Sequence, residues 1–503
     1  MRTTFLVSGL ALAGCTAVVD DSPLDVERGA ADSTATTSVC WEASAQTISG
    51  FGASSAWTAP DLSEELANEL FSPERIGLSL LRLRIAPNGT TSEVETARKA
   101  QARGAMVWAS PWSPPGVWKT SGTDAHGGSL LPQNYPAWAE RLATFVRARE
   151  DEGIHIDALS VQNEPDFVAA WETCEWEPSE LAAFVSGHLV PALDAQGVSP
   201  RLLAPESSNW GSVRRYGETL LADPVAGAAI GIVATHSYGN TQPWAYRSPG
   251  SLGKELWMTE WSDPTGEGPD AGMTSGLVVA RAIHDNLTVA EVNAWHYWWL
   301  VERSDTEAGR GGLIGEDVVT RRAYVVGQYS HFVRPGSTRV RLSSPSPQRG
   351  VFASAFVGSS GDELTLVVIN ENATPVTQAF DFTGAELSEL DATVTNDELA
   401  LEAQGSVPGG GAATLELSPR SVTTFTGSVS PSSDATTNPA CAHVLPRVIA
   451  PEESDATGCS CRQAGRSPAS RASVAFVGLL GVMAAFRRAR ARAGERVRAS
   501  SRS

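Results

Sequence analysis

Between residues 47 and 335 the sequence alternates short aliphatic runs with longer amphipathic segments. Residues 135–153, for example, place Trp138, Leu142 and Val146 on one stripe, as expected of a helix packed on a sheet. Eight such strand–helix units predict a (β/α)8 TIM barrel over residues 39–335, in the α/β class. A doubly wound sheet would need a glycine-rich phosphate turn after an early strand, which the sequence lacks. The expected barrel strands are 47–52, 78–85, 105–109, 157–162, 201–204, 230–235, 255–258 and 292–298.

After Pro335 the hydrophobic period changes to two, which is typical of β-strands with one buried face. Turn residues separate the runs, as in 358–362, Gly-Ser-Ser-Gly-Asp. This pattern predicts an attached β-sandwich side domain over residues 336–428. Its expected strands are 338–342, 351–357, 363–369, 378–382, 392–395 and 413–417.

Composition narrows the class of protein that these domains belong to. A net charge of −19 argues against a nucleic-acid partner, because such proteins normally carry a basic surface. The chain has 15 Trp and only 5 Met, and tryptophan is over-used where flat ligands such as sugars stack. The sequence shows no nucleotide, flavin or metal motif, so we expect neither a cofactor nor a metal. We expect a monomeric, exported enzyme.

The N-terminus reads as an export signal. Residues 1–15 combine Arg2, an apolar run and Leu-Ala-Gly-Cys, which resembles a lipobox that would be cleaved before a lipidated Cys15. The alternative is an ordinary signal peptide in which Cys15 is incidental. Residues 16–38 have the composition of a flexible linker.

The C-terminus contains a second candidate targeting signal. Residues 429–458 have a linker composition, and 459–503 combine Cys-Ser-Cys, the apolar run 472–486 and an arginine cluster. Fifteen helical residues cover about 22 Å, short of a ~30 Å hydrocarbon core. This order of features resembles the sorting tag of myxobacterial surface proteins, which implies anchorage at the cell surface or outer membrane. The alternative is a weakly amphipathic tail, and the sequence does not decide which terminal anchor is used.

Three cysteines lie outside the two terminal targeting segments: Cys40, Cys174 and Cys441. In an exported protein they allow at most one disulfide and leave one thiol over. The sequence does not decide which two pair.

Two glutamates follow barrel strands at the end where TIM barrels collect function. Glu164 comes after the fourth expected strand in Asn-Glu-Pro, and Glu260 comes after the seventh in Thr-Glu-Trp. Two inward carboxylates across a cleft suit glycosidic bond cleavage, where one donates a proton and the other attacks or stabilises the sugar carbon. Each glutamate alone could be a solvated loop acid, but the pair together favours catalysis.

Polar and aromatic residues at other strand ends complete the candidate site. Polar side chains would donate hydrogen bonds to the carboxylates, and tryptophans would form sugar platforms, although any one could instead be a packing residue. The candidate donors are Asn163, Arg84, His236 and Tyr238, and the candidate platforms are Trp57, Trp112 and Trp298.

Several segments resemble glycoside hydrolase family 30. They are Gly50–Ala53, Pro111–Pro115, Val161–Asp166 and Trp257–Glu260. The segments Trp171–Trp176, Ala204–Ser207 and Arg334–Gly336 resemble its xylanase branch, and the likeness extends over about residues 45–425. The resemblance implies a barrel fused to a β-sandwich to which residues near the N-terminus contribute.

By this resemblance Glu164 is the general acid/base and Glu260 the nucleophile, with retention of configuration. Asn163 would bind the sugar 2-hydroxyl, and Tyr238 and Trp298 would line the subsite. Glucuronoxylan-specific members follow the last tryptophan pair with Tyr-Ile-Arg-Arg-Ser-Tyr. Here Leu-Val-Glu-Arg-Ser-Asp replaces it, so Arg303 matches the second arginine while two acids flank it.

The sequence therefore predicts a retaining endo-β-1,4-xylanase that acts on the polysaccharide (glucurono)xylan. The alternatives are another family activity, such as a β-1,6-glucanase, β-1,6-galactanase or β-glucosidase-like enzyme, or a non-catalytic surface carbohydrate-binding protein. The exact polysaccharide, its need for glucuronate and the endo or exo pattern are not encoded in these motifs.

Overall fold

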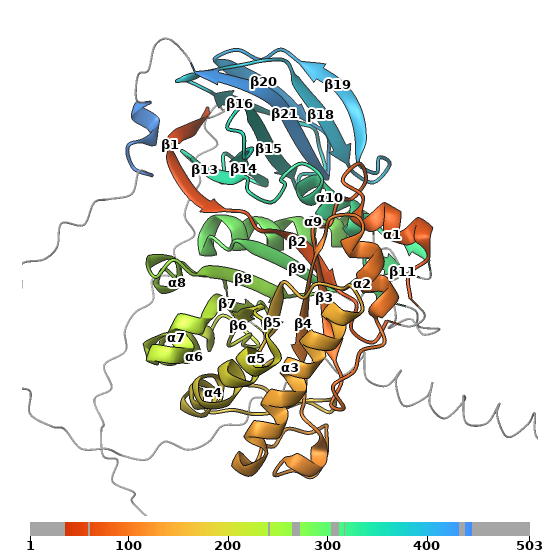
Figure 1. Ribbon diagram of the computed structural model, residues 1–503. Coiled ribbons are helices and arrows are strands. Elements are labelled where there is room, and N and C mark those ends of the chain that lie inside the picture. The colour runs from red at the N-terminus through yellow and green to blue at the C-terminus, as the bar shows by residue number, and fades with distance from the viewer. Residues whose placement is uncertain are drawn as a thin grey trace, which may run out of the picture.

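The computed structural model contains a barrel below a large curved sheet, and α10 lies between them (Figure 1). The structure describes residues 36–58, 61–239, 242–263, 272–302, 311–315, 317–431 and 438–444. The signal, the tail 459–503 and Arg303 lie outside these residues, as do most of the two predicted linkers. No helix within the described ranges is long and apolar enough to cross a membrane.

Eight parallel strands close into the predicted TIM barrel in the order of the chain. Their residues are almost all buried, which accounts for the near-continuous apolar runs in the sequence. The barrel strands are β2 (Gly50–Ser54), β3 (Leu80–Ile85), β4 (Met106–Pro111), β5 (Ala158–Ser160), β6 (Arg201–Leu203), β7 (Ile230–His236), β8 (Glu255–Glu260) and β9 (Ala294–Trp299).

A layer of large and small side chains fills the barrel interior below the strand ends. Trp108 and Trp257 meet edge to face with ring centroids 6.1 Å apart, and alanines from neighbouring strands accommodate them. Gly52 is needed here because a Cβ would lie 2.5 Å from the Leu80 carbonyl oxygen. This packed floor leaves the carboxyl ends of the strands to hold polar groups.

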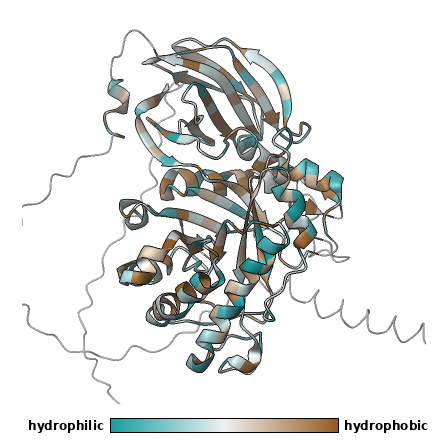
Figure 2. Ribbon diagram, in the orientation of Figure 1, coloured by the Kyte–Doolittle hydropathy of each residue, from teal (hydrophilic) through white to brown (hydrophobic). Residues whose placement is uncertain are grey.

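Helices surround the barrel and turn their apolar faces toward the strands. On α3, for example, Trp138, Leu142 and Val146 are buried as predicted, and Figure 2 shows such mixed apolar and polar helix faces. The α-helices are α1 (Glu64–Phe71), α2 (Val94–Gln101), α3 (Tyr135–Asp151), α4 (Pro178–Phe184), α5 (Val190–Gln196), α6 (Val213–Ala222), α7 (Pro224–Ala229), α8 (Ser248–Ser251), α9 (Gly272–Asp285) and α10 (Arg321–Ser330). Shorter elements are η1 (Gly116–Trp118), η2 (Pro132–Asn134), η3 (Val185–Leu189), η4 (Asn286–Ala290) and η5 (Pro439–Cys441).

The side domain is a ten-stranded sheet curved around its own apolar core, in the order β19-β18-β21-β15-β14-β13-β1-β16-β20, with β17 beside β21. Its strands are β1 (Thr37–Thr47), β13 (Thr338–Leu342), β14 (Val351–Val357), β15 (Glu363–Asn370), β16 (Val376–Asp381), β17 (Ala385–Leu387), β18 (Leu390–Thr395), β19 (Glu402–Val407), β20 (Ala412–Leu417) and β21 (Ser421–Pro431). A separate small sheet holds β10 (Val301–Glu302), β11 (Ile314–Gly315) and β12 (Val318–Val319).

The strand β1 corrects the predicted start of the barrel at residue 39. It runs antiparallel to β13 and parallel to β16, so it belongs to the side domain. Register shifts at Cys40/Ser44 and Ser44/Thr47 bend the strand between its partners. Only after residue 47 does the chain enter the barrel at β2.

The two domains share one hydrophobic core. Phe356, Val367, Ile369 and Val422 of the sheet join the cluster of buried residues that surrounds the barrel. On α10, the Gln328 side chain donates to Thr395 Oγ1 at 2.8 Å. The side domain is therefore packed as a continuation of the barrel.

A disulfide joins Cys40 on β1 to Cys441, with Cα atoms 5.5 Å apart. It holds the segment 438–444 against the side domain, and β21 extends to Pro431, so the predicted linker 429–458 begins too early. Cys174 is a buried free thiol, so the three cysteines within the described ranges form one bridge and leave one thiol over.

Candidate active site

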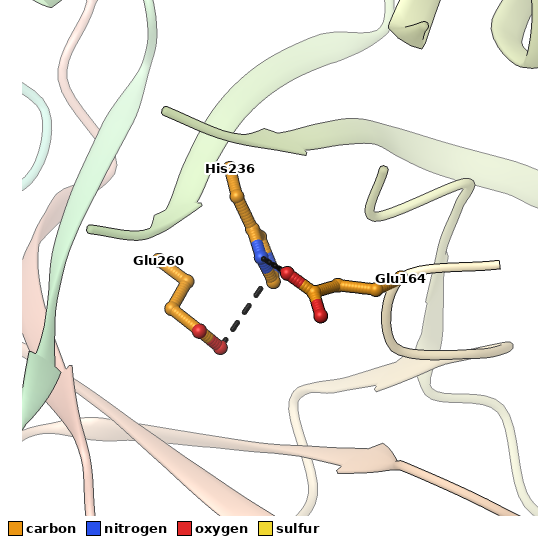
Figure 3. Close-up of side chains that lie close together, drawn as sticks. All are labelled: Glu164, His236 and Glu260. Atoms are coloured by element: carbon orange, nitrogen blue, oxygen red, sulfur yellow. Dashed lines mark hydrogen bonds and ion pairs between the residues drawn. The ribbon is translucent and has the colours of Figure 1, made fainter. Parts of the chain in front are cut away.

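Five charged or titratable side chains meet at the carboxyl ends of the barrel strands. They are Arg82 from β3, Glu164 after β5, Glu206 after β6, His236 from β7 and Glu260 from β8. Each is at most 6% exposed. Figure 3 shows Glu164 and Glu260 on either side of His236. We call these five side chains the charged cluster.

The loop after β5 aims Glu164 into the barrel. Its φ of +46° lies in the left-handed region, which a residue with a Cβ adopts only when its surroundings hold it there. The backbone N–H of Glu164 donates to the Glu206 carbonyl at 3.0 Å. The Glu164 carboxyl lies 3.0 Å from Nδ1 of His236. Backbone and side chain are therefore both fixed.

Glu260 ends β8 and is held by Arg82. The Arg82 guanidinium donates to the Glu260 carboxylate, lies 2.6 Å from Glu206 and donates to Asn163 Oδ1 at 2.5 Å. The guanidinium also makes a cation–π contact with Trp112, since its central carbon lies 4.3 Å from the centre of that ring. Arg82 is fully buried, so these contacts fix a positive charge beside Glu260.

The two candidate catalytic carboxyls are close together. One oxygen of Glu164, one of Glu260 and a ring nitrogen of His236 lie within 4.8 Å of one another. Burial raises the pKa of Glu164, against the opposing hydrogen bond from His236. Burial disfavours a charged His236, but Glu260 and hydrogen bonds to Glu164 and Glu206 outweigh it and raise the His236 pKa to about 10. At neutral pH the site therefore holds a protonated histidine among carboxyls.

A histidine and two carboxylates are also the ligand types that zinc uses. Metal ligation requires a neutral imidazole, however, and here the surrounding carboxyls favour the imidazolium. Arg82 also occupies the Glu260 carboxylate with its own positive charge. The arrangement suits proton transfer better than metal binding.

Three tryptophans from different strand ends form one aromatic wall. The Trp57 ring lies 5.0 Å from Trp112 and 6.0 Å from Trp298, between ring centroids. Trp57 and Trp298 are half-buried and can offer ring surface to a ligand. Trp112 is only 1% exposed and its ring contacts Arg82, so the prediction of an open sugar platform there is wrong.

Arg84 does not contact the two candidate catalytic carboxyls, contrary to the prediction. Its guanidinium donates twice to Glu172, from Nε at 2.9 Å and from Nη2 at 2.5 Å, and lies 4.9 Å from the Trp57 ring centre. Leu80, Arg82 and Arg84 share the inward face of β3 because side chains alternate. Arg82 lies two residues before Arg84 on this face and is therefore deeper in the barrel. This difference in depth lets Arg82, and not Arg84, reach Glu260.

Tyr238 follows β7 and lies beside His236, with ring centroids 5.9 Å apart. Burial, followed by the charge of Glu260, raises the pKa of Tyr238 well above its usual value. A phenol that stays protonated can donate a hydrogen bond to a carboxylate or a sugar.

Sequence reasoning missed Arg82 and Glu206. The alternation of β3 puts Arg82 on the same face as Leu80 and Arg84, so it could have added Arg82 as a second candidate beside Arg84. Glu206 follows β6 in Ala-Pro-Glu, much as Glu164 follows β5, and its φ of +59° repeats the left-handed conformation.

Comparison with known proteins identifies the family to which the chain belongs. The model of the glycosyl hydrolase family 30 TIM-barrel domain matches residues 90–246. The "Glucuronoxylanase XynC" of Bacillus subtilis (strain 168) is 31% identical over 395 residues, which cover 76% of this chain and 89% of that protein. The chain belongs to glycoside hydrolase family 30.

Two further relatives show the range of the similarity. The family 30 subfamily 8 xylanase Xyn30A from Clostridium acetobutylicum superposes with a TM-score of 0.70 at 32% identity, covering 78% of this chain and 99% of its own. The "Endo-1,6-beta-D-glucanase neg1" of Aspergillus fumigatus is 25% identical over 295 residues, covering 53% of this chain and 58% of that protein. This family 30 chain is thus a glycoside hydrolase by descent.

Proposed function

We propose that this family 30 member is a retaining endo-β-1,4-xylanase that hydrolyses (glucurono)xylan through a covalent glycosyl–enzyme intermediate. The observation that carries the mechanism is the approach of Glu164 and Glu260 within 4.8 Å. Retaining glycosidases hold their carboxyls about 5–5.5 Å apart, whereas inverting enzymes leave about 6.5–9.5 Å for a water molecule.

In the first step Glu260 attacks the anomeric carbon and the glycosidic bond to the leaving oxygen breaks. Glu164 gives its proton to that oxygen, and its raised pKa keeps the proton available at neutral pH. In the second step Glu164 takes a proton from water, which attacks the same carbon and releases Glu260. Arg82 stabilises the Glu260 carboxylate before attack and after release.

Two features support sugar binding beside this pair. The described residues supply no hydrogen-bond partner for the buried amide nitrogen of Asn163, which leaves it to donate to the sugar 2-hydroxyl. The half-buried Trp57 and Trp298 pack together, with the Trp298 ring 5.8 Å from the central carbon of Arg82, and Tyr238 lies beside His236. A purely carbohydrate-binding barrel would need these groups but not an acid and a nucleophile.

The preference for xylan is supported by the names of the relatives, a glucuronoxylanase and a family 30 xylanase. The proposed cleavage depends only weakly on the glucuronate branch. Glu302 is buried and its carboxylate accepts the N–H of Gly311, so a backbone group already satisfies it. By the resemblance to glucuronoxylan-specific members, Arg303 would bind the glucuronate carboxylate, and Asp305 in place of their tyrosine would repel it.

Reducing-sugar release from xylan, laminarin, pustulan and galactan tests the substrate class. Release from xylan alone supports the proposal, whereas release from pustulan would favour the β-1,6-glucanase activity named for a relative. No release from any of them would favour a binding protein. We expect less than a ~100-fold preference in kcat/KM for glucuronoxylan over linear xylan. A strict requirement for glucuronate, lost in Arg303→Ala, would show that Arg303 suffices.

We further propose that the enzyme is exported and displayed at the cell surface, by lipidation of Cys15 or by the tail 459–503. Deleting residues 459–503 together with Cys15→Ser should then release soluble active enzyme from cells. Finding the unmodified full-length protein wholly in the culture supernatant would contradict anchoring.

A further inference from the structure

Glu206 is a third carboxyl at the centre of the barrel, and the proposed reaction assigns it no role. It is fully buried, and its φ of +59° places a non-glycine residue in the left-handed region. Such backbone strain persists where the surroundings impose it, often at functional sites. A buried carboxylate is also costly unless charges and donors compensate it.

The surroundings of Glu206 supply charges and donors of this kind. Arg82 Nη2 lies 2.6 Å from one carboxylate oxygen. The hydroxyl of Ser110 donates to the other oxygen at 2.7 Å, and Ser160 donates to the same atom. His236 Nε2 lies 3.6 Å away. Burial alone would raise the pKa of Glu206, but Arg82 and these contacts lower it, so Glu206 is an anion at neutral pH.

Glu206 also reaches the catalytic acid through the backbone. Its carbonyl oxygen accepts the N–H of Glu164 at 3.0 Å. One residue therefore contacts Arg82 with its side chain and fixes the loop of Glu164 with its main chain.

The charges of the cluster balance only if Glu206 is counted. Arg82 and protonated His236 are the two cations, Glu206 is an anion, and Glu260 forms an ion pair with Arg82, which leaves Glu164 as the neutral acid. Without Glu206 the two cations would face one permanent anion and would favour ionisation of Glu164. The remaining titratable groups near the cluster are Tyr238, Asp166 and His296. Burial lowers the pKa of His296 to about 3, so it adds no positive charge.

We propose that Glu206 is a positioning residue of the catalytic site: its buried negative charge offsets Arg82 and His236 and thereby keeps Glu164 protonated for catalysis. This rests on the proposed roles of Glu164 and Glu260. It identifies Glu206 as the group that sets the alkaline limit of activity without contacting the sugar.

The substitution Glu206→Gln tests this, because it removes the charge and keeps the shape. We expect the alkaline limit of kcat/KM to move down by at least about one pH unit, a tenfold change in the proton affinity of Glu164. Activity should fall more with poor aryl leaving groups than with 2,4-dinitrophenyl glycosides, which need little acid assistance. The matched control is Glu255→Gln, at the opposite end of β8 in an ion pair with Arg201, and it should leave the pH limits unchanged.

A second readout separates this proposal from the proposed function. The carboxyl titration of Glu164 is followed by 13C NMR with labelled glutamate and assigned with Glu164→Gln, and it needs no substrate. A wild type inactive on every glycoside would refute the proposed function and leave this titration to decide the role of Glu206. If Glu206→Gln does not fold, the test uses Glu206→Asp instead. The shorter side chain moves the carboxylate away from Arg82 and His236 by one methylene, so the titration of Glu164 should shift in the same direction by less. A Glu164 titration identical to wild type in the folded variant would overturn the proposal, even if activity or thermal stability fell.

Discussion

Glu93, at the start of α2, should make the stability of the folded protein depend on pH. It is 1% exposed, and one carboxyl oxygen accepts the N–H of Arg84 at 2.9 Å and the hydroxyl of Ser55 at 3.1 Å. Its other oxygen has no partner among the described residues. Burial raises the pKa of Glu93 to about 8, against these opposing hydrogen bonds. The folded protein therefore prefers the neutral acid.

The sign of the pH effect follows from this preference. Below pH 4.5 both folded and unfolded chains hold the proton, so Glu93 has no influence on stability. Between pH 4.5 and 8 the unfolded chain has lost the proton while the folded chain retains it, so stability falls as pH rises. Relative to a neutral residue of the same shape, the cost is about 1 kcal/mol at pH 5 and about 4 kcal/mol at pH 8, as an upper limit.

The variant Glu93→Gln removes this cost. The amide oxygen can take the place of the oxygen bonded to Arg84 and Ser55, and the NH2 group the place of the unpartnered one. We expect its advantage in Tm over wild type to grow from pH 5 to pH 8 by roughly 3 °C, at about 1 °C per kcal/mol for a protein of this size. Thermal unfolding followed by circular dichroism at several pH values measures it. Other titrating groups are common to both proteins and cancel. A difference in Tm that stays constant with pH would refute the reasoning.

Two further predictions concern the cleft and the disulfide. Arg84→Ala should raise KM about tenfold and change kcat little, because Arg84 contacts Glu172 and Trp57 rather than the two proposed catalytic carboxyls. Steady-state kinetics on xylo-oligosaccharides measure both constants. A large loss in kcat at unchanged KM would contradict this prediction. Replacing Cys40 and Cys441 by serine should lower the free energy of unfolding by about 2–5 kcal/mol and leave kcat at 25 °C unchanged, because the bridge lies in the side domain. Equilibrium unfolding in urea tests it, and equal stability with and without the bridge would count against the account.

Much of this architecture could be predicted from the sequence because each barrel strand is buried on both faces. Continuous apolar runs such as 230–235 leave few alternatives to a parallel strand, and the eight strands were placed within a few residues. The side domain was harder. The strand β1 precedes the barrel in the chain but pairs with strands 300 residues later, and no local pattern encodes such a pairing. The threonine-rich β21 was missed because its sequence alternates weakly.

The candidate site shows the same division between local and long-range information. Glu164 and Glu260 were predicted because each follows a strand in a short specific motif, and the structure brings them together. The choice between Arg82 and Arg84 depends on depth inside the barrel, which alternation alone does not give. Trp112 was predicted as a platform, but the contact with Arg82 that buries it comes from a neighbouring strand. Local sequence patterns thus identified the two glutamates that we propose as reacting groups, whereas the packing of distant residues determines which side chains they contact.

The stereochemistry of the first-formed product tests the central claim most directly. Proton NMR of a β-xylo-oligosaccharide digest, recorded before mutarotation, shows which anomer the enzyme releases. Two displacements at one carbon, first by Glu260 and then by water, predict the β-anomer. Initial release of the α-anomer would mean a single displacement and would contradict the roles proposed for both glutamates.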